Sequence, residues 1–269
     1  MNANILSLQG AQKGSIEVPA IFSEAVREDL IRRAVIAEQT TKLQPKGHYL
    51  LAGMNTTARY YGAMSSYRTG RHMGVAIRPR QKLGGGQQGQ VRRIPSSVKG
   101  KRAHPHKIEK TLIERINKKE YQKAVRSAIA ATAAVDIVVK KHSVEKAQLQ
   151  LPIVLSNEIE SIKKTKDVIA MLTALKLSAE LEKSKDPSLR KGIRRLSHRR
   201  HFRKSALIVV GEDKGIIKAA RNIAGVDVCT VREINANLLA PGGVPGRITI
   251  WSESAVKSLP SEVEKLSLM

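Results

Sequence analysis

The sequence predicts an α/β protein whose sheet is mostly parallel and covered by helices on both faces. From Leu151 onward, short apolar runs alternate with stretches of helical periodicity, an arrangement typical of parallel sheets. The run Ala206–Val210 is apolar throughout, as expected of a strand that is buried on both faces. With 269 residues the chain is long enough to bury a sizeable core.

The first forty residues predict a hairpin followed by a helix. Asn4–Leu8 and Ser15–Val18 have the pattern of short strands on either side of a glycine-bounded turn. Pro19 ends the second strand, and Ser23 is expected to cap a helix that reaches about Gln39. Because apolar residues recur at spacings of three and four in that helix, one of its faces is expected to be buried.

The elements after residue 108 complete the predicted domain. A helical pattern resumes at 108–116, and Asn117 with Glu120 resembles a capping box that opens a helix to about Ala134. Further strands are predicted at 152–155, 206–210, 226–231 and 247–251. Further helices are predicted at 166–175, 178–183, 214–224, 254–259 and 261–268.

A basic stretch between residues 39 and 108 interrupts these elements. It contains 14 Lys or Arg, no Asp or Glu, and ten glycines, and neither helical nor strand periodicity persists in it. Such a stretch cannot bury enough apolar surface to offset the conformational entropy that is lost on ordering. We therefore expect residues 1–43 and 107–269 to form one globular α/β domain, into which residues 44–106 are inserted as an extended arm.

The charge of the chain is concentrated in two segments. The net charge is +25 and the isoelectric point is about 10.4, values typical of proteins with a polyanionic partner. The basic stretch carries +14, and a second basic segment, residues 185–204, carries +8. Together they account for 22 of the 25 charges, which leaves +3 for the other 179 residues. Neither segment has the pattern of a basic amphipathic helix that binds a membrane surface.

The residues that accompany these charges favour RNA as the partner. Tyrosines and methionines are interleaved with the cations of the basic stretch. Cations contact phosphates, aromatic rings stack on bases, and glycines allow close backbone approach. Residues 190–204 include eight Lys or Arg, and arginine clusters bind phosphate oxygens bidentately. The arm is therefore expected to become ordered only within folded RNA.

Cysteine usage and hydropathy exclude several other classes of protein. Cys229 is the single cysteine, which rules out an intrachain disulfide or a multi-cysteine zinc site and fits a reducing cytoplasm. The sequence has no charged-then-apolar leader and no apolar run near 18 residues, so we expect neither a secretion signal nor a membrane span.

The turn at Gly211 is the one feature that suggests an enzyme. It joins an apolar strand to a helix start, and Glu233 follows about 20 residues later, where a ribose-binding acid could fall. However, Glu212 and Asp213 stand where a phosphate would have to bind. An RNA-modifying enzyme with a cofactor-binding α/β domain is therefore the alternative to a structural RNA-binding protein. A DNA-compacting protein is a third, less favoured hypothesis, because it would not need an inserted arm.

The sequence gives no support for a catalytic residue, a cofactor or a metal ion. Two histidine pairs, His104 with His106 and His198 with His201, lie among cations without a carboxylate or thiolate, which disfavours a divalent metal. Cys229 lies in an apolar strand pattern, where a buried and inert thiol is the expectation.

Five motifs are specific enough to compare with known families. They are Ala52–Ala58, Thr69–Arg71 with Pro79–Arg80, Gly100–Pro105, Arg126–Thr132 and Leu239–Arg247. In this order they resemble the archaeal type of the large-subunit ribosomal protein L-four family, and the similarity covers nearly the whole chain. The chain differs from that pattern by additional residues around 62–67 and 82–90, and it lacks the long basic C-terminal extension of the eukaryotic members.

The resemblance implies a three-layer α/β/α domain on the surface of the large ribosomal subunit, in the cytoplasm. It implies that the arm reaches through large-subunit rRNA to the nascent-peptide exit tunnel, where it forms the constriction together with protein L-twenty-two and meets the nascent peptide in passing. The tip of the arm would consist of Thr69, Gly70, Arg71, His72, Met73 and Gly74. The expected work is the folding and assembly of rRNA and the shaping of the tunnel wall.

The residues expected to contact RNA are cations and histidines of the arm and of the second basic segment. They are Lys46, Arg59, Arg68, Arg71, His72, Arg78, Arg80, Lys82, Arg92, Arg93, Lys99, Lys101, Arg102, His104, His106, Arg190, Lys191, Arg194, Arg195, Arg199, Arg200, Arg203 and Lys204.

Overall fold

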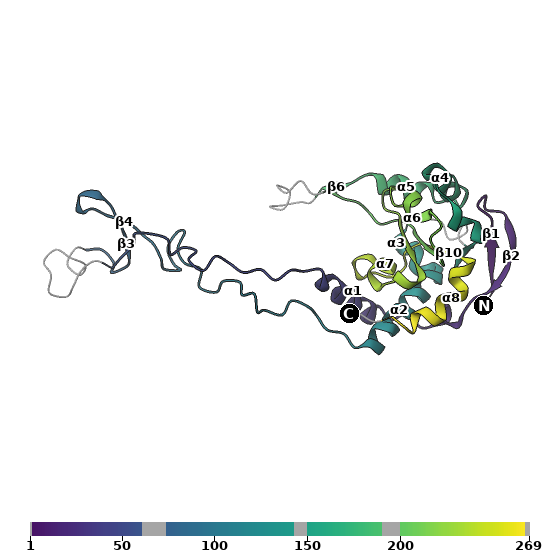
Figure 1. Ribbon diagram of the computed structural model, residues 1–269, viewed down its shortest axis with the longest axis horizontal. Helices are drawn as coiled ribbons and strands as arrows, with labels where there is room; N and C mark the ends of the chain where they lie inside the picture. Colours follow the sequence, from purple (N-terminus) through teal and green to yellow (C-terminus); the bar gives the residue numbers. More distant parts are fainter. Residues whose placement is uncertain (1, 61–73, 143–149, 190–199, 267–269) are drawn as a thin grey trace. The chain divides into compact units, whose positions relative to one another are not determined.

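The computed structural model describes residues 2–60, 74–142, 150–189 and 200–266. Its internal contacts divide the chain into two compact units (Figure 1). The first unit consists of Met1–Lys42 and Ile113–Met269 and holds the sheet with its helices. The second unit consists of Leu43–Leu112 and holds most of the basic stretch.

Six strands form the sheet of the first unit, in the order β2-β1-β5-β10-β8-β9. Their bounds are Asn2–Leu6 (β1), Gln12–Glu17 (β2), Ile153–Leu155 (β5), Leu207–Val210 (β8), Asp227–Thr230 (β9) and Thr249–Ser252 (β10). β1 and β2 pair in antiparallel orientation, and the other neighbours in the sheet are parallel. The predicted α/β class with a mostly parallel sheet is confirmed.

The central strands β5, β8 and β10 are buried at every position, and successive residues of a strand point to opposite sides of the sheet, so both faces are covered there. Val209 and Trp251 belong to one apolar cluster, whereas their neighbours Ile208 and Ile250 belong to another. The first cluster includes residues of α1 (Glu28–Thr41), α2 (Lys118–Ala133), α7 (Ala236–Leu239) and α8 (Glu253–Val263). The second includes residues of α3 (Val135–Lys141), α4 (Thr165–Ala174), α5 (Ser178–Lys185) and α6 (Ile216–Ala220). The domain therefore has three layers.

Most predicted elements of this unit are present with slightly shifted bounds. The hairpin, the parallel strands and helices α1, α2, α4 and α5 confirm the sequence patterns, and α6 is shorter than expected. Helix α3 was not predicted, since its seven residues are too few to display a clear period. Short 3-10 helices lie at Ala20–Ser23 (η1), Asn157–Ser161 (η5), Val231–Glu233 (η7) and Pro241–Gly243 (η8).

The prediction that Ser23 caps the first long helix is wrong. Ser23 is the last residue of η1, and α1 begins only at Glu28. The chain between them is fixed by the backbone N–H of Arg27, which donates to Ser127 Oγ at 2.6 Å. Glu28 and Asp29 then supply negative charge in the first turn of α1, where it complements the helix dipole.

The predicted helix at 108–116 is also wrong, because these residues have no helical conformation. Ile108 and Ile113 are 66% and 49% exposed. A short helix is stable mainly when an apolar face is buried against other elements. Without that burial, the apolar spacing alone does not produce a helix.

Two further details differ from the predictions, namely the N-cap of α2 and the break in the last helix. Asn117 is the N-cap residue of α2 but its side chain accepts no capping hydrogen bond. Glu120 instead binds Arg33, with Oε1 2.7 Å from Nη1. The two closing helices predicted at 254–259 and 261–268 are one helix, α8, which continues through Pro260 to Val263. Leu259 and Val263 are both buried, and this packing outweighs the hydrogen bond that proline removes.

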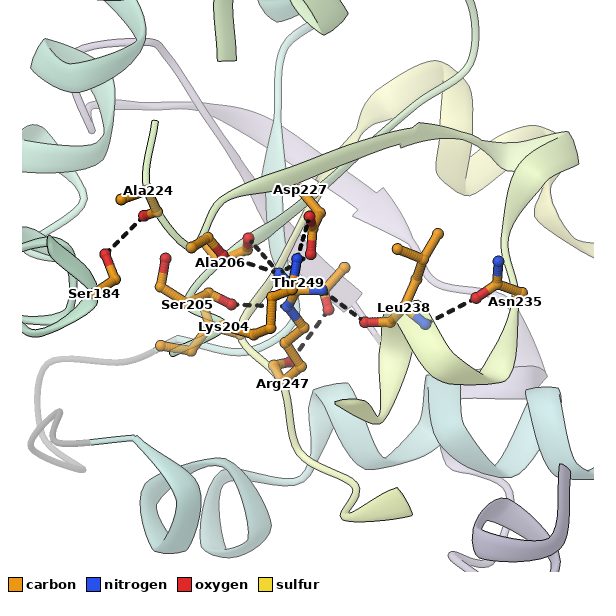
Figure 2. A network of polar contacts seen from close by, with 12 residues as sticks. Ser184, Lys204, Ser205, Ala206, Ala224, Asp227, Asn235, Leu238, Arg247 and Thr249 are labelled. Atoms are coloured by element: carbon orange, nitrogen blue, oxygen red, sulfur yellow. Dashed lines mark hydrogen bonds and ion pairs between the residues drawn. The ribbon is translucent and has the colours of Figure 1, made fainter. Parts of the chain in front are cut away.

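Arg247 is fully buried and ties the ends of the central strands together (Figure 2). Its guanidinium donates, over 2.8–3.2 Å, to four backbone carbonyl oxygens, those of Ser205, Ala206, Gly225 and Leu238. It also lies 2.7 Å from Asp227 Oδ2, while Lys204 Nζ lies 2.7 Å from Oδ1 of the same carboxylate. The final residue of the motif Leu239–Arg247 therefore has a structural role.

The second unit contains a short two-stranded sheet of β3 (Arg80–Lys82) and β4 (Gln88–Val91), joined by a turn that includes η3 (Gly84–Gly86). No regular structure was predicted here, because neither strand has an apolar face. A second antiparallel pair, β6 (Ser188–Leu189) with β7 (Arg200–His201), belongs to the first unit. None of the helices in the described part of the chain has both the length and the apolar character needed to cross a membrane.

Candidate nucleic-acid interface

The second unit is built from two chain segments that approach each other closely at glycines. A Cβ atom built on Gly47 would lie 3.0 Å from Ile108 Cγ1, and one built on Gly53 would lie 2.5 Å from the Gly100 carbonyl oxygen. Gly53 also has a φ of +72°, a conformation that only glycine adopts without cost. A Cβ on Gly100 would collide with the carbonyl oxygen of Ile94. The glycines of the basic stretch thus allow its outgoing and returning segments to pack side by side.

Backbone and arginine hydrogen bonds organise the head of this unit, which we define as residues 52–60 and 79–101. Arg59 and Arg80 exchange two backbone hydrogen bonds of 3.0 Å each, and the N–H of Arg92 donates to the Pro79 carbonyl oxygen at 3.0 Å. The Arg93 guanidinium donates to the Ala58 carbonyl oxygen at 3.2 Å. The expectation that this stretch has no structure of its own is corrected, because the described residues form a small hydrogen-bonded fold.

Most of the described cations of the second unit are exposed, and they have no acidic partner among the described residues. Within residues 43–60 and 74–112, no Lys or Arg side chain lies within the 4.0 Å ion-pair distance of a described carboxylate. Several guanidinium groups instead donate to neutral acceptors; Arg92, for example, donates to Gln90 Oε1 at 2.8 Å and to the Val98 carbonyl oxygen. Like charges that lack counter-charges repel one another, and phosphates would relieve that repulsion.

Most of the arm residues that were predicted to contact RNA are exposed to solvent. The exposed ones are Lys46, Arg59, Arg78, Lys82, Arg93, Lys99, Lys101, Arg102, His104 and His106, whereas Arg80 and Arg92 are half-buried. Arg68, Arg71 and His72 lie outside the described residues, as do the tip residues Thr69, Gly70 and Met73. Gly74 is described and exposed.

The second basic segment includes a hairpin on the first unit. Arg190, Lys191, Arg194, Arg195 and Arg199 lie outside the described residues, and Arg200 is a residue of β7. Arg203 and Lys204 are fixed where the hairpin returns to the domain. The Arg203 guanidinium donates to the Lys141 carbonyl oxygen at 2.6 Å, and Lys204 pairs with Asp227.

A cavity of about 520 Å³ lies at the base of this hairpin. Four cations line it, namely Lys141, Lys183, Arg203 and Lys204, together with Asp186, Ser188, Pro241 and Gly242. Sequence reasoning missed Lys141 and Lys183. Lys183 lies in the last turn of α5, only two residues before the second basic segment, whereas Lys141 ends α3, 63 residues before Lys204. Only the fold therefore brings Lys141 to this segment, and its signal in the sequence was the doublet Lys140-Lys141.

Lys141 differs electrostatically from the other cations of this cavity. Burial, and then repulsion by the Arg247 guanidinium, lowers the pKa of Lys141 to about 8. Its Nζ donates to the carbonyl oxygen of Val244 at 2.5 Å. The charged form is favoured at Asp227. Although burial raises the pKa of this carboxyl, the charge of Arg247 and the hydrogen bond from Lys204 keep it below its ordinary value.

The turn at Gly211 lines a separate cavity of about 650 Å³ at the carboxyl ends of the central strands. The backbone N–H groups of both glycines in this turn already have acceptors. That of Gly211 donates to Glu160 Oε1 at 3.2 Å, and that of Gly215 donates to Asp213 Oδ1 at 2.9 Å. Glu160 is 2% exposed, and hydrogen bonds from serines and from Lys214 hold its pKa low against the effect of burial. Carboxylates therefore take the positions that a nucleotide phosphate would need.

The described residues also offer no metal site. No group of three or more His, Cys, Asp or Glu side chains that could hold an ion occurs among them. His106 Nε2 lies 3.5 Å from Arg102 Nη1, a cationic neighbour that would oppose a metal ion. The thiol of Cys229 is buried, and burial, followed by repulsion from Glu233, raises its pKa to about 12, which leaves it protonated and unreactive at neutral pH.

The chain is similar over nearly its whole length to the proteins of one family. A family profile described as "Ribosomal protein L4/L1 family" matches residues 16–262. The large ribosomal subunit protein uL4 of Methanococcus maripaludis is 44% identical over 262 residues, which cover 96% of this chain and 98% of that protein. The uL4 proteins of Archaeoglobus fulgidus and Halorubrum lacusprofundi are 42% and 41% identical over 261 residues each, covering 96% of this chain and 98% and 99% of theirs. The chain belongs to the ribosomal protein L4/L1 family.

Proposed function

We propose that this protein is a structural constituent of the large ribosomal subunit, in the cytoplasm, and that it binds large-subunit rRNA to stabilise its folding and assembly. The observation that carries the proposal is the set of exposed cations in the second unit, which have no carboxylate within ion-pair distance among the described residues. Neutralising phosphates would release their counterions, which is the main source of affinity in such complexes. The family and its relatives support the ribosome as the place where this happens.

In this proposal the globular domain and the arm have different tasks. Residues 1–43 and 107–269 form the globular domain, and residues 44–106 form the arm that enters the RNA. The arm extends to the nascent-peptide exit tunnel and forms its constriction with protein L-twenty-two, so the nascent peptide passes its tip. The tip residues Thr69–Gly74 are assigned through the resemblance to the family, since most of them lie outside the described residues. The protein carries out no reaction and holds no cofactor.

Salt-dependent RNA binding tests the role of the arm cations. We would replace Arg59, Arg78 and Lys82 together by glutamine and measure binding of the full chain to large-subunit rRNA between 50 and 300 mM salt, by filter retention. Each lost phosphate contact reduces the slope of log K against log salt by about 0.7 to 0.9. The triple variant should therefore lose about 2 units of slope. A slope equal to that of the unsubstituted protein would contradict the proposal.

A matched control uses three exposed cations of the globular domain, Lys166, Lys218 and Arg221, none of which has a described ion pair. Their replacement by glutamine removes the same charge but should leave the slope unchanged, because they lie outside the two basic segments.

A deletion of residues 54–99 tests the division of labour. The new junction joins Gly53 to Gly100, which are already in contact. Because both apolar clusters of the core lie in the first unit, the truncated chain should melt cooperatively at an unchanged temperature. It should nevertheless impair assembly of large subunits. Normal subunits built with the truncated chain would refute the role of the arm.

A further inference from the structure

A cavity of about 360 Å³ lies within the head of the second unit, and its lining differs from that of a simple phosphate site. Met54, Ala58, Pro79 and Ile94 supply apolar surface, and Ala58 and Pro79 are buried. Tyr60 also lines the cavity, and the residue is 68% exposed. Three cations, Arg59, Arg93 and Lys101, complete the lining, which contains no acidic residue. The cavity thus combines an apolar floor, an exposed aromatic ring and a cationic rim.

The cavity is held open by the fold of the head. The paired backbones of Arg59 and Arg80 fix one wall. Arg93 fixes another, because its guanidinium binds the Ala58 carbonyl oxygen. Arg93 has a φ of +69°, a left-handed conformation that costs a non-glycine residue of the order of 1 kcal/mol or more and persists only where surrounding contacts enforce it. Such backbone strain is concentrated at binding sites.

The combination of groups selects one class of occupant. A duplex would offer the cations its phosphates, but its stacked bases could not reach an apolar floor. An apolar side chain of a protein would suit the floor but would leave three cations without a counter-charge. A nucleotide that is splayed out of the RNA stack supplies both a flat apolar base and a phosphate, and aromatic rings in RNA-binding proteins stack on such bases. A cavity of this size falls at the lower end of the range found for small-molecule sites.

We infer that this cavity binds a single unpaired nucleotide of RNA, with its base stacked on Tyr60 and its phosphates held by Arg59, Arg93 and Lys101. The inference rests on the proposed RNA-binding function and deepens it, because it assigns one part of the head to base recognition and the rest to phosphate contact. The site takes any base with a π face, since stacking does not distinguish one base from another. The arm therefore recognises a place where the RNA chain is unstacked.

Fluorescence anisotropy with two labelled probes tests this site in the full chain. The probes are a uridine hexamer and the same hexamer with abasic riboses. Stacking of one base contributes roughly five- to hundredfold in affinity. The protein should therefore bind the uridine hexamer at least fivefold more tightly than the abasic hexamer. Equal affinities would overturn the inference.

Two tyrosine variants separate the cavity from the general basic surface. Tyr60→Ala should lower the affinity for the uridine hexamer to that for the abasic hexamer and leave abasic binding unchanged, whereas Tyr60→Phe should keep the preference because it keeps the ring. The matched control is Tyr49→Ala: Tyr49 is 61% exposed in the same unit but does not line the cavity, so its loss should have no effect. An equal loss in both alanine variants would show that the cavity has no special role.

A second measurement uses the unsubstituted protein, so its result does not depend on whether a variant folds. Photo-cross-linking with a 5-iodouridine hexamer, followed by mass spectrometry, should attach the base to Tyr60 rather than to Tyr49; attachment to Tyr49 alone would count against the site. The proposed function has its own test, because large-subunit rRNA would be bound with a steep salt dependence whether or not a base enters the cavity. Failure of rRNA binding would refute the function, and failure of the base preference alone would refute only this inference.

Discussion

Replacement of the buried Arg247 is expected to destabilise the globular domain severely. The side chain has 0% exposure, and it binds four backbone carbonyl oxygens and the Asp227 carboxylate within 3.2 Å. These carbonyls belong to segments that are distant in sequence, because Ser205 precedes Arg247 by 42 residues and Gly225 precedes it by 22. The substitution Arg247→Ala removes the guanidinium that donates to all of these acceptors.

The size of the effect follows from what remains behind. Breaking a buried ion pair by removing one partner costs about 3 to 5 kcal/mol, since buried groups lose their partner without regaining water. Lys204 stays 2.7 Å from Asp227, so the carboxylate keeps one cation. The carbonyl oxygens of Ala206 and Gly225 keep the backbone N–H groups of Asp227 and Ser205 as donors, but those of Ser205 and Leu238 lose the Arg247 donor. In a domain of this size, each kcal/mol shifts the melting temperature by about 2 to 4 °C. Arg247→Ala should therefore lower the melting temperature by about 6 to 20 °C.

Thermal unfolding followed by circular dichroism measures this directly. Arg247→Lys should lose less than Arg247→Ala, because lysine keeps the charge but cannot present donors to several carbonyls at once. Arg221→Ala is the matched control, since Arg221 is an exposed arginine of the same domain without a described side-chain partner; exposed substitutions of this kind change stability by less than about 0.5 kcal/mol. If Arg247→Ala melted within 2 °C of the unsubstituted protein, the structural role assigned to this arginine would be wrong.

Three further predictions concern other buried or crowded positions. The Glu38 carboxylate accepts hydrogen bonds from Tyr121 Oη (2.8 Å) and from two backbone N–H groups of α7 (2.7 and 2.9 Å). Glu38→Gln should therefore lower the free energy of unfolding by about 1 to 3 kcal/mol in urea titrations, with an unchanged m-value. An unchanged midpoint would contradict this. Gly100→Ala should weaken rRNA binding without changing the melting of the globular domain, since its Cβ would collide with Ile94 in the second unit; equal effects on both would argue against independent units. Cys229 should react with Ellman's reagent at pH 8 only after unfolding in guanidinium, because burial raises its pKa to about 12; rapid reaction of the folded protein would show that the thiol is accessible.

Hydrophobic pattern predicted the sheet well because burial on both faces leaves a clear signal. Leu207–Val210 is apolar and buried at every position, and Ile250 and Trp251 give the same signal at the centre of the fully buried strand Thr249–Ser252. The same reasoning failed at 108–116, where apolar spacing exists but no surface is available to bury it. Local pattern therefore identifies elements that the core requires and misjudges those that depend on an absent partner.

The candidate site could be located from charge but its internal structure could not. The absence of acidic residues and the density of cations identified the basic stretch and the segment 185–204. However, the head of the second unit is held by the Arg59–Arg80 pairing and by the Arg93 hydrogen bond, and neither leaves a periodic signal. The same limit applies to Lys141, which reaches its cavity through α3, and to Arg247, whose partners come from three other segments. An arginine in a basic chain suggests RNA contact, and only its surroundings show whether it is buried.

The chain uses arginine for two opposite purposes, and the difference lies in where the counter-charge comes from. Arg247 is neutralised within the domain by Asp227 and by carbonyl dipoles, so its stabilising effect is independent of any ligand. Arg59, Arg80 and Arg93 lie close together with no described carboxylate to balance them, so the free second unit is destabilised by their mutual repulsion. At physiological ionic strength salt screens repulsion between exposed charges that are more than about 8 Å apart, and added salt shortens this distance, yet it also weakens phosphate binding. Salt should therefore stabilise the free second unit and destabilise its complex with RNA, because the same uncompensated charge opposes folding in one state and drives association in the other.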